Sequence, residues 1–266
     1  MQFEGHEIKS SDQESQRVNL GKLLEKTKWL IKQMLPAKAQ SVSLEKLLDE
    51  RERLDELIRD RFTREITVIF TDFEGLTSVA DSAGDIASRI LIKRKHNIVL
   101  PIIEAGHGVL VKTMGDGTLS YFKDASDAVR AAVRIQRKIN TFNLSGKSAV
   151  PIMLRIGINT GVGFVEEHDI FGDVVNVASR FESLAGPGEI FISEETFNAL
   201  TDKNEFYCRY VQTTNLEGKK DLFSVFKVFW NEHEIEKDRT LVGCPTIVIP
   251  DPVSSTGQAL IGNPVF

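Results

Sequence analysis

Short apolar runs alternate with longer amphipathic stretches from residue 64 to residue 230, and this alternation constrains the fold more than any other feature of the chain. The predicted strands are 66–72, a hairpin over 109–122, 151–158, 189–192, a run near Tyr207 and 223–229. The predicted helices are 86–105, 125–142 and 173–184. The order β-α-β-β-α-β with additions is that of a ferredoxin-like fold, an antiparallel sheet with helices on one face. We therefore expect an α+β domain over residues 63–230.

The segment before this domain has a different composition. Residues 1–16 are polar, and we expect a flexible N-terminus. Residues 17–62 show helical periodicity with a break at Pro36, and 14 of the 21 residues from Glu45 to Glu65 are charged around a thin apolar seam. Because such a helix buries little surface alone, we expect a signalling or dimerisation segment that pairs with a second copy as a short coiled coil. Packing of this helix on its own domain is the alternative.

Overall composition argues against several classes of protein. The net charge of −5 leaves no excess of positive charge to meet the phosphates of a nucleic acid. Cys208 and Cys244 are the only cysteines, and no Cys/His cluster has metal-ligand spacing, so neither a disulfide framework nor a zinc site is expected. We find no signal-peptide pattern and no apolar run near the length of about 18 residues that spans a membrane, and we expect a cytoplasmic protein.

Residues 231–266 contain four of the eight prolines, which predicts an extended C-terminal tail.

Two aspartates stand where the predicted sheet can bring them together. Asp72 ends the first strand, and Asp116 lies at the tip of the hairpin, between Gly115 and Gly117. In a ferredoxin-like sheet the end of the first strand and this hairpin are neighbours. Each aspartate alone is typical of a turn or a helix cap, but the pair can hold two hard cations for phosphoryl chemistry.

A polar stripe lies on the predicted helix that follows Asp169-Ile-Phe-Gly-Asp173. Asn176 and Arg180 are four residues apart and share a face, whereas the apolar residues of the helix lie mostly on the other side. Such a stripe is ordinarily a solvated face. An Asn and an Arg at this place are equally suited to bind a ribose and a phosphate.

Four motifs in order carry a resemblance to a known family. They are Phe-Thr-Asp-Phe-Glu-Gly-Leu-Thr from Phe70, Lys-Thr-Met-Gly-Asp-Gly from Lys112, Arg-Ile-Gly-Ile-Asn-Thr-Gly from Arg155, and Gly-Asp-Val-Val-Asn-Val-Ala-Ser-Arg from Gly172. The region from Arg64 to about Trp230 resembles a class III nucleotidyl cyclase catalytic domain. The resemblance implies the cyclase catalytic fold for residues 63–230 and a reaction that needs no protein nucleophile.

The resemblance assigns a role to each matching residue. Asp72 and Asp116 would bind two divalent cations, Mg²⁺ or Mn²⁺, with help from the backbone carbonyl of Phe73. The product would be a 3′,5′-cyclic nucleotide, formed by in-line attack of the ribose 3′-hydroxyl on the α-phosphorus with release of pyrophosphate.

The resemblance also assigns the substrate contacts. Lys112 and Asp169 would read the purine, Asn176 would orient the ribose, and Arg180 would meet charge at the α-phosphate. Lys219 is our choice for a polyphosphate contact. An ammonium donor beside a carboxylate acceptor suits adenine, so the expected substrate is ATP.

In this family the metal aspartates come from one subunit and the other site residues come from its partner, so the resemblance implies a homodimer. The segment between Gly161 and Asp169 is shorter than the hairpin that usually helps to hold this dimer. An upstream sensor domain or protein is a possible partner. The alternatives are a guanylate cyclase, a catalytically inactive nucleotide-sensing homologue, and a structural coiled-coil protein with a passive domain.

Overall fold

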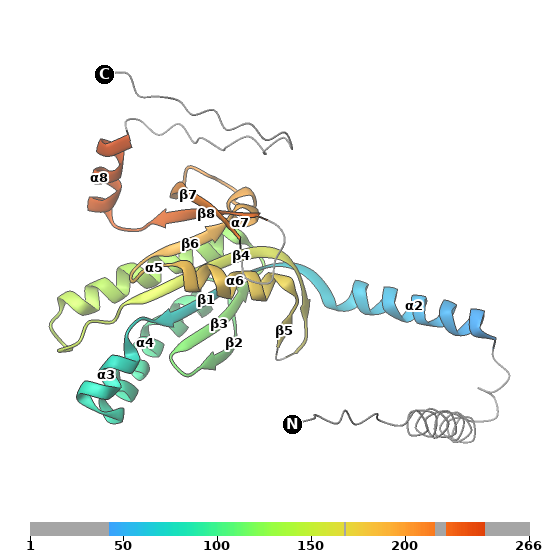
Figure 1. Cartoon of the computed structure of the whole chain (residues 1–266), viewed down its shortest axis with the longest axis horizontal. Coiled ribbons are helices and arrows are strands. Elements are labelled where there is room, and N and C mark those ends of the chain that lie inside the picture. Colours follow the sequence, from blue (N-terminus) through green and yellow to red (C-terminus); the bar gives the residue numbers. More distant parts are fainter. Residues whose placement is uncertain (1–42, 168, 216–221, 243–266) are drawn as a thin grey trace, which may run out of the picture. The chain divides into compact units, whose positions relative to one another are not determined.

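The structure is a computed structural model, and it describes residues 43–167, 169–215 and 222–242 (Figure 1). The chain divides into two units, residues 1–61 and residues 62–266. The predicted flexible N-terminus and the first part of the predicted helical segment lie outside the described residues. The position of Lys219 does as well.

A sheet of eight strands forms the centre of the second unit. The strands are β1 (Thr63–Phe73), β2 (Val109–Met114), β3 (Gly117–Phe122), β4 (Leu154–Val165), β5 (Ile170–Phe171), β6 (Ile190–Ser193), β7 (Tyr207–Asn215) and β8 (Leu222–Phe229). Their order is β2-β3-β1-β4-β6-β8-β7, with β5 paired to β4. All neighbours are antiparallel except β4 and β6, which run parallel. The α+β class and the predicted strands are confirmed.

The helices of the described chain are α2 (Leu44–Phe62), α3 (Leu76–Ala83), α4 (Asp85–Ala105), α5 (Ala125–Leu144), α6 (Asp173–Leu184), α7 (Glu194–Asn198) and α8 (Glu232–Val242). The three helices predicted within the domain correspond to α4, α5 and α6. The helices α3 and α7 and the short strand β5 were not among the predicted elements. All three are short elements, which periodicity detects poorly.

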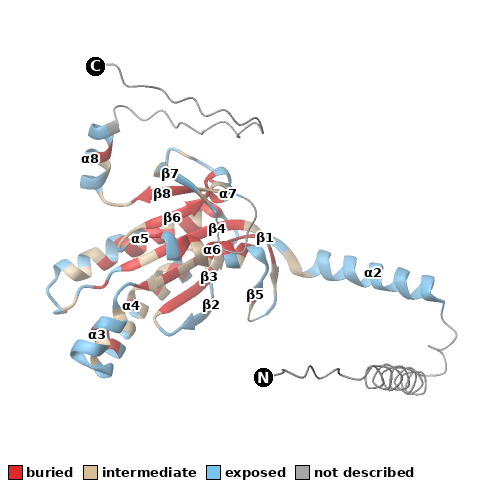
Figure 2. Cartoon of the chain, viewed as in Figure 1, coloured by how far each residue is buried: buried red, intermediate tan, exposed pale blue. Residues whose placement is uncertain are grey.

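Helices cover both faces of the sheet, and the expectation of helices on one face was wrong (Figure 2). On one face, Ile69 of β1 shares a core with residues of α4 and α5. On the other face, Ile66 and Val68 pack with Val174 and Ala178 of α6. The reason is visible in β1, whose run Ile-Thr-Val-Ile-Phe is apolar on both sides and is typical of a strand buried on both faces.

Glycine allows α6 to approach the sheet closely. A Cβ added at Gly157 in β4 would lie 2.0 Å from the backbone nitrogen of Glu182 and 2.5 Å from the carbonyl oxygen of Ala178. Both atoms belong to the backbone of α6, so neither can move aside cheaply. The absence of a side chain at this position therefore sets the distance between α6 and β4.

The predicted extended tail begins with a helix instead. Asn231 accepts a hydrogen bond from the backbone N–H of His233 at 2.9 Å, and α8 follows without a proline until Pro245. Asp238 of α8 is buried, accepts a hydrogen bond from the Tyr207 hydroxyl at 2.9 Å and pairs with Arg209. The prolines that suggested an extended tail all lie in residues 243–266, outside the described part of the chain.

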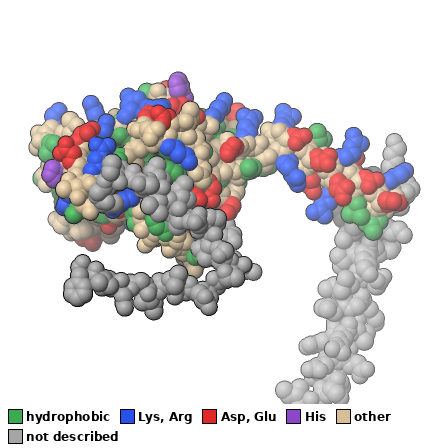
Figure 3. Space-filling model, turned by 90° about the horizontal axis from the view of Figure 1, so that it is seen from above, with side chains coloured by type: hydrophobic (Ala, Val, Ile, Leu, Met, Phe, Trp, Pro, Cys, Tyr) green, Lys and Arg blue, Asp and Glu red, His purple; other side chains and the backbone are tan. Residues whose placement is uncertain are grey.

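The helix α2, taken by itself, matches the predicted charged helix. It contains 19 residues and none of them is buried. Its leucines and Ile58 are exposed, and acidic and basic side chains alternate along it (Figure 3). The coiled coil and the dimer stay predictions. No helix in the described ranges is long and apolar enough to cross a membrane.

We expect Gly157→Ala to destabilise the domain, because its methyl group would overlap the backbone of α6. Overpacking of this kind costs about 2–3 kcal/mol, which corresponds to a fall in Tm of roughly 4–12 °C in a domain of this size. Thermal denaturation followed by circular dichroism measures it. Gly161→Ala is the matched control, because a Cβ there meets only Val174 at 3.5 Å. Equal melting temperatures for the two variants would contradict the close contact.

Candidate active site

The structure brings Asp72 and Asp116 together. Asp72 lies near the end of β1, directly after Thr71, whose hydroxyl bonds to that of Thr118 across β1 and β3 at 2.6 Å. Oδ1 of Asp72 lies 3.7 Å from the position that a Cβ would take at Gly117. Asp116 is the neighbour of Gly117 in the tight turn between β2 and β3. The pairing of β1, β2 and β3 therefore places the two carboxylates close together, where β1 ends and the β2–β3 hairpin turns.

The turn that carries Asp116 requires glycine. Met114 pairs with Gly117, so the loop consists of Gly115 and Asp116 alone. Gly115 has φ +63°, and Asp116 is not among the residues with positive φ. A positive φ at the first central residue only is the pattern of a type II′ turn, in which glycine stands first. Asp116 is thus held at the tip of a hairpin whose shape the backbone fixes.

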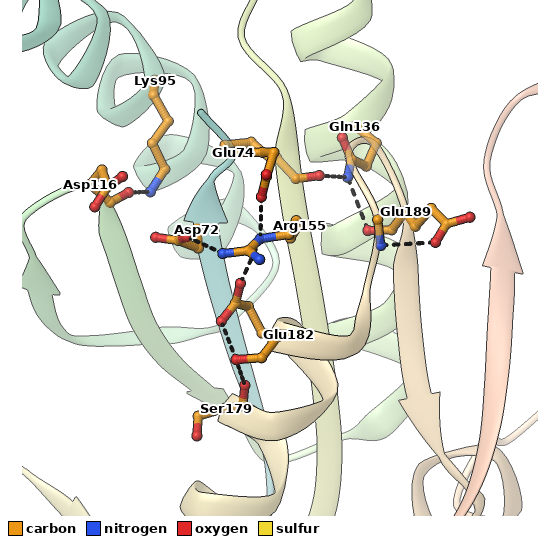
Figure 4. A network of polar contacts seen from close by, with 12 residues as sticks. Asp72, Glu74, Lys95, Asp116, Gln136, Arg155, Ser179, Glu182 and Glu189 are labelled. Carbon is orange, nitrogen blue, oxygen red and sulfur yellow. Dashed lines mark hydrogen bonds and ion pairs between the residues drawn. The ribbon is translucent and has the colours of Figure 1, made fainter. Parts of the chain in front are cut away.

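Arg155 is the hub of the charge network around Asp72 (Figure 4). Its Nη2 donates to Oδ2 of Asp72 at 2.6 Å. Its Nε lies 3.0 Å from Glu74 and 3.1 Å from Glu182, as ion pairs without hydrogen-bond alignment. Asp72 and Arg155 are direct partners in the antiparallel register of β1 and β4, so strand pairing places them side by side.

Lys95 supplies the second positive charge. It is fully buried on α4, at the same helical stripe as Leu91 and Val99, and its Nζ donates to the backbone carbonyl of Asp116 (Figure 4). Burial lowers the pKa of Lys95 to about 8, while the charges of Asp72 and Asp116 oppose this shift. A buried ammonium group thus ties α4 to the turn that carries Asp116.

Negative charge exceeds positive charge in this network. Four carboxylates, those of Asp72, Glu74, Asp116 and Glu182, face the two cationic side chains of Lys95 and Arg155. Burial raises the pKa of Glu182 to about 7. Burial and then the charge of Asp72 raise the pKa of Asp116. In both cases burial is the largest cause, and the nearby cations oppose the shift without cancelling it.

The donor set around Asp72 and Asp116 fits divalent cations. Carboxylate and carbonyl oxygens are the ligands that Mg²⁺ and Mn²⁺ prefer, and the greater number of acidic than basic side chains here favours their binding. Phe73 ends β1 with its ring buried in the core, so only its backbone can take part. Among the described residues no group of three or more His, Cys, Asp or Glu side chains forms a ready cation cage. Substrate oxygens would have to complete the coordination.

Lys112 and Asp169 form a second constellation. They are 57 residues apart in sequence, and Nζ of Lys112 lies 2.9 Å from Oδ1 and 2.8 Å from Oδ2 of Asp169. The hydrogen bond from Lys112, and then one from the backbone N–H of Ile170, lower the pKa of Asp169. The two side chains are 44% and 30% exposed, so a ligand can reach them.

Asn176 and Arg180 lie on α6 as predicted. Asn176 is exposed and Arg180 is half-buried, whereas Val177 and Phe181 of the same helix are buried against the sheet. The polar stripe therefore faces away from the core of its own chain.

Lys95, Arg155, Glu74 and Glu182 were not singled out by the sequence analysis. Arg155 stands at the start of a quoted motif, and the strand pairing alone would have placed it opposite Asp72. Lys95 interrupts the apolar stripe of α4, which is a recognisable sign of a buried charge with a partner. Glu74 and Glu182 lack such a sign, because an acidic residue after a strand or within a helix is ordinary.

The comparisons with known proteins agree with this geometry. The family model of the adenylate and guanylate cyclase catalytic domain matches residues 58–229. An adenylate cyclase of Anabaena cylindrica is 29% identical over 185 residues, which cover 62% of this chain and 37% of the relative. Retinal guanylyl cyclase 1 of Bos taurus is 27% identical over 211 residues, covering 73% of this chain and 18% of the relative. The chain thus spans less than two fifths of the length of either protein.

A solved structure shows the same architecture. The crystal structure of the adenylyl cyclase CyaB from P. aeruginosa aligns with a TM-score of 0.57 and 26% identity, covering 63% of this chain and 94% of that chain. The match extends over nearly the whole of that chain. Residues 58–229, which the family model matches, contain the acidic pair and the Lys112–Asp169 pair. From its family model, its relatives and its fold, this chain belongs to the class III adenylate and guanylate cyclase catalytic domain family.

Proposed function

We propose that the domain is an adenylate cyclase, which converts ATP to 3′,5′-cyclic AMP and pyrophosphate at two composite sites of a homodimer. The observation that carries the choice of ATP is the contact between Lys112 and Asp169, at 2.8 Å. It places one strong donor and one strong acceptor at a single accessible position. The curated relatives include both adenylate and guanylyl cyclases, so the proposed choice of ATP rests on these side chains.

The chemistry of the purine edges favours adenine. Adenine presents an N6 amino donor and an N1 acceptor, whereas guanine presents an O6 acceptor and an N1–H donor. The carboxylate of Asp169 can accept from N6, and the ammonium group of Lys112 can donate to N1. Guanine would place O6 against the carboxylate and leave polar groups unpaired.

Asp72 and Asp116, with the carbonyl of Phe73, would hold two divalent cations, Mg²⁺ or Mn²⁺. Bound there, such ions lower the pKa of the 3′-hydroxyl and neutralise the triphosphate. Arg155 keeps the carboxylate of Asp72 in place, since it also contacts Glu74 and Glu182. Lys95 orients the Asp116 turn through a backbone contact that does not use the carboxylate.

Asn176 and Arg180 would complete the site of the partner subunit. Their stripe faces away from the core of their own chain, as residues that act on a second copy require. Asn176 would orient the ribose, and the guanidinium of Arg180 would stabilise negative charge on the α-phosphate. The exposed apolar residues of α2 support pairing of two copies upstream. A polyphosphate contact from Lys219 and an upstream sensor belong to the same proposal.

A guanylate cyclase is the second candidate, because the alignment with retinal guanylyl cyclase 1 covers 73% of this chain. A catalytically inactive homologue is disfavoured by the presence of Asp72, Asp116, Asn176 and Arg180 together.

We expect Asp116→Asn to lower cyclase activity by about 100-fold or more, because it removes a negative ligand worth several kcal/mol to the transition state. Lys95 bonds to the backbone of residue 116, so the turn should keep its shape. Production of cyclic AMP from ATP and Mn²⁺ measures the loss, and Asp81→Asn on α3 is the matched control. Retention of a tenth of wild-type activity by Asp116→Asn would refute the cation assignment.

Mixing two inactive variants should restore activity if the sites are composite. Asp72→Ala and Arg180→Ala damage different halves of a site, so each mixed dimer keeps one intact site. Random mixing of a two-fold symmetric dimer then predicts about a quarter of the wild-type activity. The assay is turnover of the mixture against each variant alone. Isolated mixed dimers that are as inactive as the parents would rule out shared sites.

The wild-type protein should prefer ATP over GTP by about 100-fold in kcat/KM, because guanine would leave polar groups of the Lys112–Asp169 pair unpaired. Lys112→Glu combined with Asp169→Cys should weaken this preference. Lys147→Glu, an exposed lysine in the loop before β4, is the control for the charge change. Equal kcat/KM values for both nucleotides in the wild type would favour the guanylate cyclase.

A further inference from the structure

A cavity lies apart from the candidate active site. It has a volume of about 490 Å³ and lies between α5, the segment that leads into β7, and α8. None of the residues that line it belongs to the acidic pair, to the Lys112–Asp169 pair or to the polar stripe of α6. The volume is in the range of pockets that bind small molecules.

The wall of the cavity is rich in positive charge. Five cationic side chains line it against two carboxylates, those of Glu205 and Glu232. Both carboxylates are already paired. Arg130 contacts Glu205 through two parallel hydrogen bonds of 2.7 and 2.8 Å, and Arg137 contacts Glu232 at 3.2 Å. The remaining three cations, Arg134, Lys203 and Arg239, therefore give the cavity its net charge.

These three cations lack an acidic partner in the part of the chain that the structure describes. Arg134 of α5 is exposed and makes no hydrogen bond or ion pair there. Lys203 bonds only to the amide oxygen of Asn198, at 3.1 Å, and lies 4.6 Å from the ring centroid of Phe197. The guanidinium of Arg239 stacks over the ring of Tyr207 at 5.2 Å. The two arginines lie on different helices, α5 and α8, and both line the cavity.

The rest of the cavity is apolar and aromatic. The side chains that provide this surface are Val133, Phe197, Phe206, Phe229 and Ile235. The thiol of Cys208 belongs to the same surface, and burial raises the pKa of this thiol to about 12, so it stays neutral. Binding of a flat apolar group to this surface would remove apolar area from water, which favours binding.

We infer that this cavity binds a small organic anion, with a flat apolar body and a group that carries two negative charges. Guanidinium groups bind phosphate and carboxylate oxygens through paired hydrogen bonds, and Arg134 and Arg239 can each provide such a pair. The apolar surface takes the body of the ligand. The site is independent of the proposed cyclase reaction, because it uses none of the same residues.

Phenyl phosphate is a suitable probe, because it combines a ring with a dianion. Isothermal titration calorimetry on the full chain, with a non-cyclisable ATP analogue and Mg²⁺ at saturation, keeps the probe out of the active site. We expect saturable binding to the wild type, and binding of inorganic phosphate that is at least about tenfold weaker because it lacks the ring. Arg134→Gln combined with Arg239→Gln should weaken phenyl phosphate binding by about tenfold or more.

Lys138→Gln is the matched control, because Lys138 is exposed on α5 but does not line the cavity. It should bind phenyl phosphate as the wild type does. Both replaced arginines are exposed, so an unchanged Tm should show that the double variant is folded. The inference is overturned if the wild type does not bind phenyl phosphate. Equal affinity in the double variant and the control overturns it as well, as does equal affinity of the wild type for inorganic phosphate.

Discussion

The antiparallel pairing of β1 with β4 runs along the whole of β1, from Thr63 opposite Phe164 to Phe73 opposite Leu154. On one face, this pairing lines up the apolar residues that α4 and α5 cover. On the other face, it lines up Ile66 and Val68 beside the glycines of β4, where α6 packs closely. At its end it sets Asp72 against Arg155. A slip of one residue in this register would turn every side chain to the opposite face and separate the two charges.

A network of acidic and basic side chains holds the candidate active site together, and its charges do not cancel. Arg155 contacts three carboxylates and Lys95 contacts the Asp116 turn, yet these two cations do not balance the four acidic groups. Lys95 and Glu182 are the buried members of this network, and removal of a partner of a buried charge is generally more destabilising than the loss of one surface ion pair. The contacts that position Asp72 and the Asp116 turn are therefore present before any ligand binds.

Much of this arrangement follows from local pattern. The run at Ile66–Phe70, the Gly115–Asp116 turn and the amphipathic helices predicted the sheet and placed Asp72 near Asp116. Other features depend on tertiary packing. The sequence near Lys95 does not indicate that its partner is Asp116, 21 residues away. The helix α8 was not predicted, because the prolines that follow it dominate the composition of residues 231–266. The position of α6 on the second face could have been inferred from the double-sided apolar run of β1. The roles of Asn176 and Arg180 concern a second chain, which the contacts within one chain do not reveal.

The Lys112–Asp169 pair is already closed before a nucleotide arrives. In the proposed reaction a purine would exchange this internal bond for two bonds of its own, and the number of polar contacts would rise little. The base would then determine which nucleotide is accepted, while most of the attraction would come from the triphosphate and its cations. Cyclic AMP has lost two phosphates and offers mainly a base that competes with the internal pair. Such a site would have a low affinity for cyclic AMP, so product inhibition should be weak.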